Sequence, residues 1–397
     1  MDIFCASSDA SDTGLALDDV IHQLGIAGFQ EADFLSAHFS HGYDVATIGD
    51  RLGGRAGTSL HAGSSCLGVM SNSGMISAQG NGLGVFAIKD PEGSYGTGMA
   101  PFDGDPRAAA RAAITQALDA ADRPGEAPDL VWLTASPGTE EQVLRGITDE
   151  VGENVPIVGG SAADNDISGA WKISDGRDCL GEGVVVSVLF PSTRLSIAYQ
   201  SGYAPTQRTG IVTGAAGRRL SAIDGRPAAE VYGQWTGGDV VPRGLDAPAM
   251  ILSESTFTPL GRHAGDVAEV PFYLLSHPAA VHPDGSIDLF TDIAEGEEVT
   301  LMQGAADSLT SRAGRVAAFA AARGRLARDG IAGALVIYCG GCMLAVNERM
   351  DEVARGIDQA LGGAPFLGIF TFGEQGPILD GYNAHGNLMI SCVTLAR

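Results

Sequence analysis

The sequence predicts a mixed α/β protein of two domains. The chain has 397 residues, too many for one ordinary core, and suits two domains of about 200 residues each. Helical and strand patterns alternate in both halves, and glycine-rich turns typical of hairpins separate many strands. We therefore expect two domains, each a mixed sheet with packed helices, and a ligand cleft between the domains or at strand ends.

Cap residues and apolar spacing give the elements of the first half. Ser11 or Asp12 can cap the first helix, Pro106 suits the first turn of another, and Thr139 with Gln142 forms a capping-box pattern. Continuous apolar runs, such as GVVVSVLF at 183–190, predict buried strands. The expected helices are 11–25, 43–52, 107–122 and one following Thr139. The expected strands are 32–40, several short ones within 59–89, and then 129–136, 155–161 and 183–190.

Apolar periodicity is lost at about residues 201–217, so the predicted domains are 1–205 and 206–397. We expect each half to contain its own sheet. In the longest helix, Leu309, Val316, Phe319 and Leu326 are expected to form one buried stripe. The helices expected in the second half are 227–235, 309–329 and one from an Asn347 cap to Leu361. The strands expected there are 271–276, 287–290, 331–338, 365–372 and 387–395.

Charge and hydropathy exclude two classes of partner. The chain has 24 Lys and Arg against 48 Asp and Glu, a net charge of −24, which repels nucleic acids and anionic lipids. No apolar run reaches the roughly 18 residues of a membrane span, and the N-terminus lacks the pattern of a secretory signal. We therefore expect a cytoplasmic protein with neither a nucleic-acid nor a membrane partner.

The six cysteines include one close pair, Cys339 and Cys342. A structural zinc site needs about four ligands, and no second close pair is present, so we expect no metal and reduced thiols. The pair follows a predicted strand, so a redox-active dithiol stays open as an alternative to two small core residues.

Four glycine-flanked segments place polar groups at the ends of predicted strands, where α/β proteins usually bind ligands. We expect these segments, which lie up to 300 positions apart, to converge on one cavity. Their glycines indicate either tight turns or backbone amides that face a ligand. The predicted ligand-binding residues are Ser65, Cys66, Gly159, Gly160, Ser161, Asp164, Cys339, Gly340, Gly373 and Glu374.

No nucleotide-binding, serine-hydrolase or metalloprotease motif is present. The leading hypothesis is a protein that binds a small ligand. An alternative is an enzyme in which Cys339 or Cys66 is a nucleophile and Glu374 or His385 is the acid or base. A structure with a thiol within about 4 Å of either acid–base group would favour the enzyme. An interaction module without a pocket is a third alternative.

The order of several motifs resembles the FIST N-terminal and C-terminal domains from about residue 20 to 395. The first half contributes Gly63-Ser-Ser-Cys, Pro156-Ile-Val-Gly-Gly-Ser-Ala-Ala-Asp and Gly183-Val-Val-Val. The second half contributes Ile223-Asp-Gly-Arg-Pro, Cys339-Gly-Gly and Gly373-Glu-Gln-Gly-Pro. Each motif is short, and their shared order carries the resemblance.

The resemblance implies a sensory protein of bacterial signal transduction that binds a small ligand, for which amino-acid-like compounds have been suggested. The two halves account for the length, so signalling would need a separate partner such as a histidine kinase. One branch of the family binds haem and senses nitric oxide, and His38, His61, His277 and His385 are the candidate axial ligands here, although none lies in a haem-specific pattern. We therefore expect no cofactor, with a haem-based sensor as an alternative. The Cys-x-Gly-Arg of many members is Cys339-Gly-Gly-Cys342 in this chain, so the cation expected for a carboxylate ligand is missing.

Overall fold

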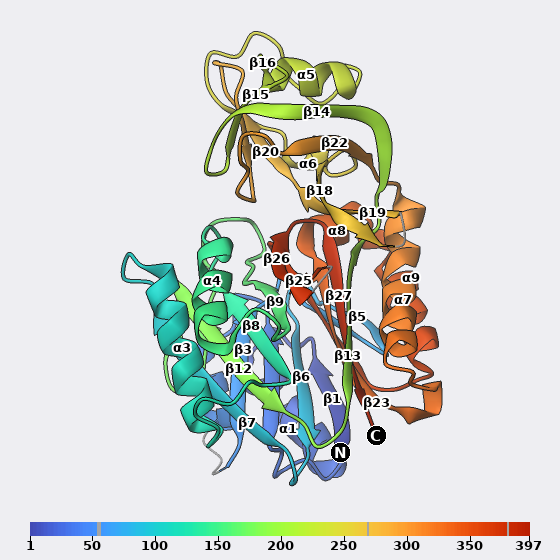
Figure 1. Cartoon of the computed structure of the whole chain (residues 1–397). Helices are drawn as coiled ribbons and strands as arrows, with labels where there is room; N and C mark the ends of the chain where they lie inside the picture. The colour runs from blue at the N-terminus through green and yellow to red at the C-terminus, as the bar shows by residue number, and fades with distance from the viewer. Residues whose placement is uncertain (54–56, 268–269, 379–380) are drawn as a thin grey trace.

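A computed structural model describes residues 1–53, 57–267, 270–378 and 381–397 (Figure 1). It contains a main body, residues 1–201 and 306–397, and an upper region, residues 204–303, at the top of Figure 1. Both termini lie at the end of the main body away from the upper region. The mixed α/β fold class is confirmed, because mixed sheets with packed helices build the protein.

Three six-stranded sheets form the main body. The first sheet has the order β1 (Asp2–Ser8), β6 (Leu83–Lys89), β2 (Phe34–Phe39), β3 (Ser59–Ser64), β10 (Ile173–Ser174) and β11 (Cys179–Leu180). The second has the order β26 (Asn383–Gly386), β25 (Glu374–Pro377), β9 (Ile157–Ser161), β8 (Leu130–Ala135), β12 (Gly183–Phe190) and β7 (Ser94–Pro101). The third has the order β13 (Leu195–Ser201), β27 (Met389–Ala396), β23 (Ile331–Cys339), β24 (Phe366–Thr371), β4 (Val69–Ser71) and β5 (Gly74–Ile76).

The upper region contains one nine-stranded sheet. Its strands are, in order, β17 (Ala249–Met250), β20 (Pro278–Val281), β21 (Ile287–Leu289), β15 (Arg219–Ile223), β14 (Ala204–Ala216), β22 (Glu298–Gln303), β18 (Leu260–Val267) and β19 (Val270–Ser276), with β16 (Arg226–Pro227) beside β15. Two helices belong to this region, α5 (Ala228–Trp235) and α6 (Leu252–Ser255).

Helices cover the outer face of each main-body sheet, and the inner faces meet in a central core. The first sheet packs against α1 (Thr13–Ile26) and α2 (Val45–Ile48), which continues as a π turn (Gly49–Gly53). The second packs against α3 (Pro106–Ala120) and α4 (Glu140–Val151). The third packs against α7 (Ala306–Arg323) and α9 (Met350–Leu361), on the opposite side of Figure 1 from α3 and α4. The remaining helical segments are α8 (Gly340–Ala345) and the 3₁₀ turns Arg328–Gly330 and Asn347–Arg349.

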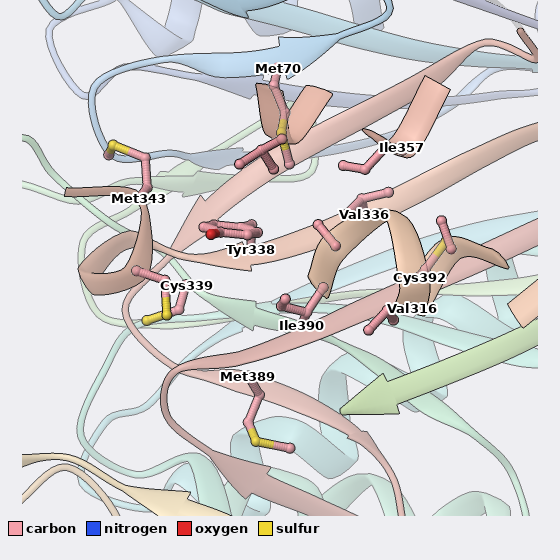
Figure 2. Close-up of a cluster of buried hydrophobic side chains, with 14 of the residues drawn as sticks. Met70, Val316, Val336, Tyr338, Cys339, Met343, Ile357, Met389, Ile390 and Cys392 are labelled. Carbon is pink, nitrogen blue, oxygen red and sulfur yellow. The ribbon is translucent and has the colours of Figure 1, made fainter. Parts of the chain in front are cut away.

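The alternation of side chains along each strand builds these layers. On β23, Val336 and Tyr338 pack toward the helices, as Figure 2 shows, while Leu335 and Ile337 join the central core. Both sets are fully buried, which explains why the sequence shows β23 as a continuous apolar run.

The structure corrects the expectation that each half holds its own sheet. The third sheet places β4, β5 and β13 beside β23, β24 and β27, so one core crosses the predicted boundary. The region without apolar periodicity is the long strand β14, whose side chains are mostly exposed and therefore do not alternate in polarity. The chain does leave the main body there, but 306–397 return to it. The division into 1–205 and 206–397 stays a prediction.

Three local expectations are also wrong. Phe319 is 48% exposed, because the buried stripe of α7 runs through the alanines 313, 317 and 320 beside Val316. Asn347 does not cap α9, since a 3₁₀ turn intervenes and the helix begins at Met350. Thr139 does precede α4, but its side chain accepts no capping hydrogen bond.

Within the part of the chain that the structure describes, no helix has the length and apolar character needed to cross a membrane.

Candidate functional site

The four predicted segments meet at the ends of neighbouring strands. Cys339 and Thr371 are paired at the ends of the parallel strands β23 and β24. Ser161, at the end of β9, accepts a hydrogen bond from Phe372 N (3.1 Å) and donates one to Gly373 O (2.8 Å) through its backbone. Cys66 N donates to Phe370 O (3.1 Å). Segments up to 300 positions apart thus lie side by side, and their expected convergence on one cavity stays a prediction.

The glycines in these segments allow close packing of the sheet. A Cβ atom on Gly159 would lie 1.9 Å from Leu133 O, and one on Gly160 would lie 2.4 Å from Thr371 Cγ2. A Cβ on Gly373 would lie 2.5 Å from His385 Cε1. A Cβ on Gly340 would lie 3.2 Å from Thr371 O. Packing therefore accounts for these glycines, and backbone amides that face a ligand stay a prediction.

Gly159→Ala is expected to destabilise the protein by about 3 kcal/mol or more, because the new methyl group would force the parallel strands β8 and β9 apart. Gly181→Ala is a matched control, since a Cβ there meets no atom within 4 Å, and we expect a change within about 0.5 kcal/mol. Urea denaturation of both variants measures the difference. Equal stabilities would contradict the packing role.

The predicted polar side chains are mostly engaged with their own surroundings. Ser65 Oγ donates to Gly68 O and accepts from Phe370 N (2.9 Å). Ser161 Oγ donates to Glu140 Oε1 (2.6 Å). The Asp164 carboxylate accepts from the backbone N–H groups of Ile167, Gly169 and Ala170, and so closes the loop that follows it. These side chains therefore stabilise the strand ends and the loop after Asp164 by hydrogen bonds within the protein.

Glu374 is a buried carboxyl group with Cys339 beside it. It is fully buried, and its oxygens accept from Thr371 Oγ1 (2.9 Å) and Met389 N (2.9 Å). Burial, together with the nearby Cys339 thiol, raises the pKa of Glu374 well above its usual value. Its surroundings therefore favour the neutral form of the carboxyl group, and the Cys339 thiol lies beside it.

A cavity of about 380 Å³ lies between the upper region and the main body. Among the predicted ligand-binding residues only Cys339 lines it. Among the residues that the structure describes, none with a charged side chain lines it. The lining residues from the main body are Pro137, Ile167, Trp171, Cys339, Gly341, Leu344, Ala345, Thr371, Phe372 and Asn387, and those from the upper region are Leu252, Ser253, Thr256, Phe257, His277 and Phe290.

Two polar groups of this lining were not among the predicted ligand-binding residues. His277 Nε2 lies 3.0 Å from Leu252 O and must donate to it, which leaves Nδ1 as an acceptor. Burial lowers the pKa of His277 to about 4, so the ring is neutral. Asn387 accepts from His277 N through Oδ1 (3.1 Å). His277 and Asn387 are 110 positions apart, so no local pattern in the sequence could predict that they meet at this site.

A buried ionic cluster links the two regions beside the cavity. Arg218, in the turn between β14 and β15, donates to Glu140 and to Glu141 Oε2 (2.7 Å) at the start of α4. Asp292 N donates to Glu141 Oε1 (2.9 Å), and His385 Nε2 lies 4.0 Å from Glu140 Oε2. Burial alone would raise the pKa of Glu140, but His385 and Arg218 outweigh it, and the pKa is lowered. Glu140, Glu141 and Arg218 are therefore ionised and anchor the upper region on α4.

His385 belongs to this cluster and does not line the cavity. Gln375 Nε2 donates to His385 Nδ1 (3.1 Å), and His385 Nε2 donates to Phe290 O (3.1 Å). His38 and His61 are buried in the central core, where His61 contacts Ser187 Oγ and Thr134 Oγ1. Only His277 of the four candidate haem ligands reaches the cavity. In the described residues, no group of three or more His, Cys, Asp and Glu is arranged to hold a metal ion.

Two curated proteins are similar in sequence to part of this chain. Uncharacterized proteins of Mycobacterium bovis and Mycobacterium tuberculosis are each 27% identical over 240 residues, which is 58% of this chain and 58% of each relative. The chain thus spans less than two thirds of the length of these curated relatives.

Two solved structures show a low overall likeness. The cyanuric acid hydrolase from A. caulinodans has 9% identity, a TM-score of 0.40, and coverage of 100% of this chain and 99% of the hydrolase chain. PurLQS from Thermotoga maritima has 10% identity, a TM-score of 0.23, and coverage of 77% and 73%. Neither likeness is high enough to bear on function.

The family models match almost the whole chain. The FIST N domain matches residues 33–226, and the FIST C domain matches residues 228–377. The matched order is the one that the short motifs predicted. FIST domains are associated with sensing in signal transduction. The chain belongs to the FIST family, with a FIST N domain followed by a FIST C domain.

Proposed function

We propose that this protein is a cytoplasmic bacterial sensor that binds a small, uncharged organic ligand in the cavity between the upper region and the main body. The observation that carries the proposal is the lining of that cavity, which both regions supply. A ligand that touches both regions can change how they are held together, and such a change can be passed to a separate signalling partner. A histidine kinase is the partner class that the family suggests.

The lining indicates the chemistry of the ligand. Aromatic and aliphatic side chains provide most of the surface, and His277 Nδ1 is a hydrogen-bond acceptor. Without a charged side chain, the cavity has no counter-ion for the carboxylate or ammonium group of a free amino acid. An uncharged ligand therefore fits this site better than the amino-acid-like compound that the resemblance suggested.

The described residues do not fit a haem. His277 holds Leu252 O through Nε2, so only Nδ1 is free to face an iron. Haem propionates also need cations or donors, and no Arg or Lys lines the cavity. His38, His61 and His385 are engaged elsewhere.

The enzyme alternative is supported by one contact, between Cys339 and Glu374. The pKa of Cys339 is raised above its ordinary value of 9.0, so the thiol is protonated at neutral pH and is not activated as a nucleophile. The pKa of Glu374 is raised as well, which favours its neutral form. This arrangement favours binding over nucleophilic catalysis.

Filling the cavity tests the proposal. Ala345→Phe places a ring in the space that a ligand would occupy, and we expect the small molecules that copurify with the protein to be lost from native mass spectra. Ala112→Phe, on the exposed face of α3, is the matched control and should retain them. If both variants carry the same molecules as the unmodified protein, the cavity is not the binding site.

A further inference from the structure

The pair Cys339 and Cys342 has an arrangement that core packing alone does not require. Cys339 ends the buried strand β23, and Cys342 lies in the first turn of α8. Both are free thiols, and their sulfur atoms lie within hydrogen-bonding reach of each other. Two sulfurs this close, three positions apart at a strand-to-helix turn, can form a disulfide after a small adjustment.

The two thiols differ in their access to the cavity. Cys339 lines it, whereas Cys342 is 1% exposed and does not. Figure 2 shows Cys339 beside Tyr338, at the end of β23. The sulfur of Cys342 contacts Tyr203 Oη (3.6 Å), and because that hydroxyl already donates to Thr256 O (2.8 Å), the thiol is the donor to Tyr203. One thiol is thus placed to meet a molecule in the cavity, and the other to resolve the product.

We propose that Cys339 and Cys342 form a redox-active dithiol that is oxidised by a small, uncharged organic disulfide entering the cavity. The Cys339 thiolate attacks one sulfur of this disulfide, which forms a mixed disulfide and releases one small thiol. Cys342, after losing its proton, attacks the Cys339 sulfur, which forms the Cys339–Cys342 disulfide and releases the second small thiol. The protein gives up two electrons and two protons in total, and the small disulfide takes them up.

The cavity sets the size and charge of the oxidant. Cys339 is only 5% exposed inside a space of about 380 Å³, so a folded protein cannot reach its sulfur. The uncharged lining gives no counter-ion to a charged disulfide. These two limits favour 2-hydroxyethyl disulfide over glutathione disulfide as a probe.

The reaction is expected to be slow at neutral pH. Contact with Cys342 and burial raise the pKa of Cys339, although the backbone N–H groups of Cys342 and Leu388 act in the opposite direction. Since the thiolate is the attacking species, the rate should rise about tenfold per pH unit through the mildly alkaline range.

Mass spectrometry of the reduced protein treated with 2-hydroxyethyl disulfide tests the proposal. Residues 329–349 form a single tryptic peptide that contains both cysteines, and it should lose two hydrogen atoms. Cys342→Ser should stop at the mixed disulfide on Cys339, and Cys339→Ser should leave Cys342 unmodified. Glutathione disulfide should react at least tenfold more slowly with this pair, whereas exposed Cys179 serves as an internal control that accepts both probes.

Three results would overturn the proposal. One is a peptide 329–349 that stays reduced while Cys179 is modified. A second is a disulfide between Cys339 and Cys66, which lies near it. The third is equal modification of Cys342 in Cys339→Ser, provided that thermal melting shows this variant to be folded. Cys392→Ser, in the helix-facing core, is the substitution control and should react as the unmodified protein does. None of these readouts requires the ligand of the proposed function.

Discussion

Thermal unfolding is expected to show maximal stability near pH 6.5 and a steep loss toward acid. Burial lowers the pKa of His38 to about 3 and of His277 to about 4, and that of His61 well below the ordinary value of 6.5. The unfolded chain therefore binds protons below pH 6.5 that the folded protein does not. Each histidine should cost about 1.4 kcal/mol per pH unit in this range, and the three together about 4 kcal/mol.

Glu374 has the opposite sign. Its folded pKa is raised above the ordinary 4.5, so the folded protein holds a proton that the unfolded chain has released. Its contribution to stability is complete below pH 4.5 and is lost, by about 1.4 kcal/mol per pH unit, as the pH rises toward the folded pKa. The histidines outweigh it between pH 4.5 and 6.5, and above pH 6.5 the Glu374 slope applies up to its folded pKa.

Differential scanning calorimetry from pH 4.5 to 8.5 measures both limbs of this curve. Glu374→Gln should flatten the alkaline limb, because the amide still accepts from Thr371 or Met389 and does not ionise. His277→Gln should reduce the acid slope by about half, because Glu374 already cancels the contribution of one of the three histidines. An alkaline limb that is the same in Glu374→Gln and the unmodified protein would contradict a buried neutral carboxyl group.

Arg218→Met is expected to destabilise the protein by about 3–5 kcal/mol, because it leaves Glu140 buried without its guanidinium partner. Glu140 is 2% exposed, and its remaining partners are the Ser161 hydroxyl, the Gly138 N–H (3.0 Å) and His385. Because Arg218 also binds Glu141, the loss should weaken the contact between the upper region and α4. Chemical denaturation measures the free energy of unfolding.

Two further variants make this prediction specific. Glu140→Gln in the Arg218→Met background removes the uncompensated charge and should recover at least half of the loss. Arg219→Met is the matched control, since its ion pair with Asp288 is largely exposed and should be worth at most about 1 kcal/mol. A loss as large for Arg219→Met as for Arg218→Met would contradict the role of burial.

Local sequence patterns determined most of the elements. Capping residues and apolar runs predicted α1, α3, β8, β12 and β23 close to their observed bounds, because each depends on neighbours within a few positions. The fold class and the order of the FIST domains followed from the same local information. So did the four segments at strand ends, since glycine and polar residues after an apolar run mark where a buried strand stops.

Only the tertiary structure decided which of these residues share a sheet, a charge cluster or a cavity wall. Strands from both halves of the chain form the third sheet, and an apolar run does not indicate which strand will pair with it. Nothing in the sequence around Arg218 distinguishes it from an ordinary surface residue. It pairs with the buried Glu140 because the turn after β14 lies against the start of α4. In the same way, only the structure shows that His277 lines the cavity and that Glu374 does not. The direction of a side chain depends on the register between strands, and that register is fixed by packing between distant segments.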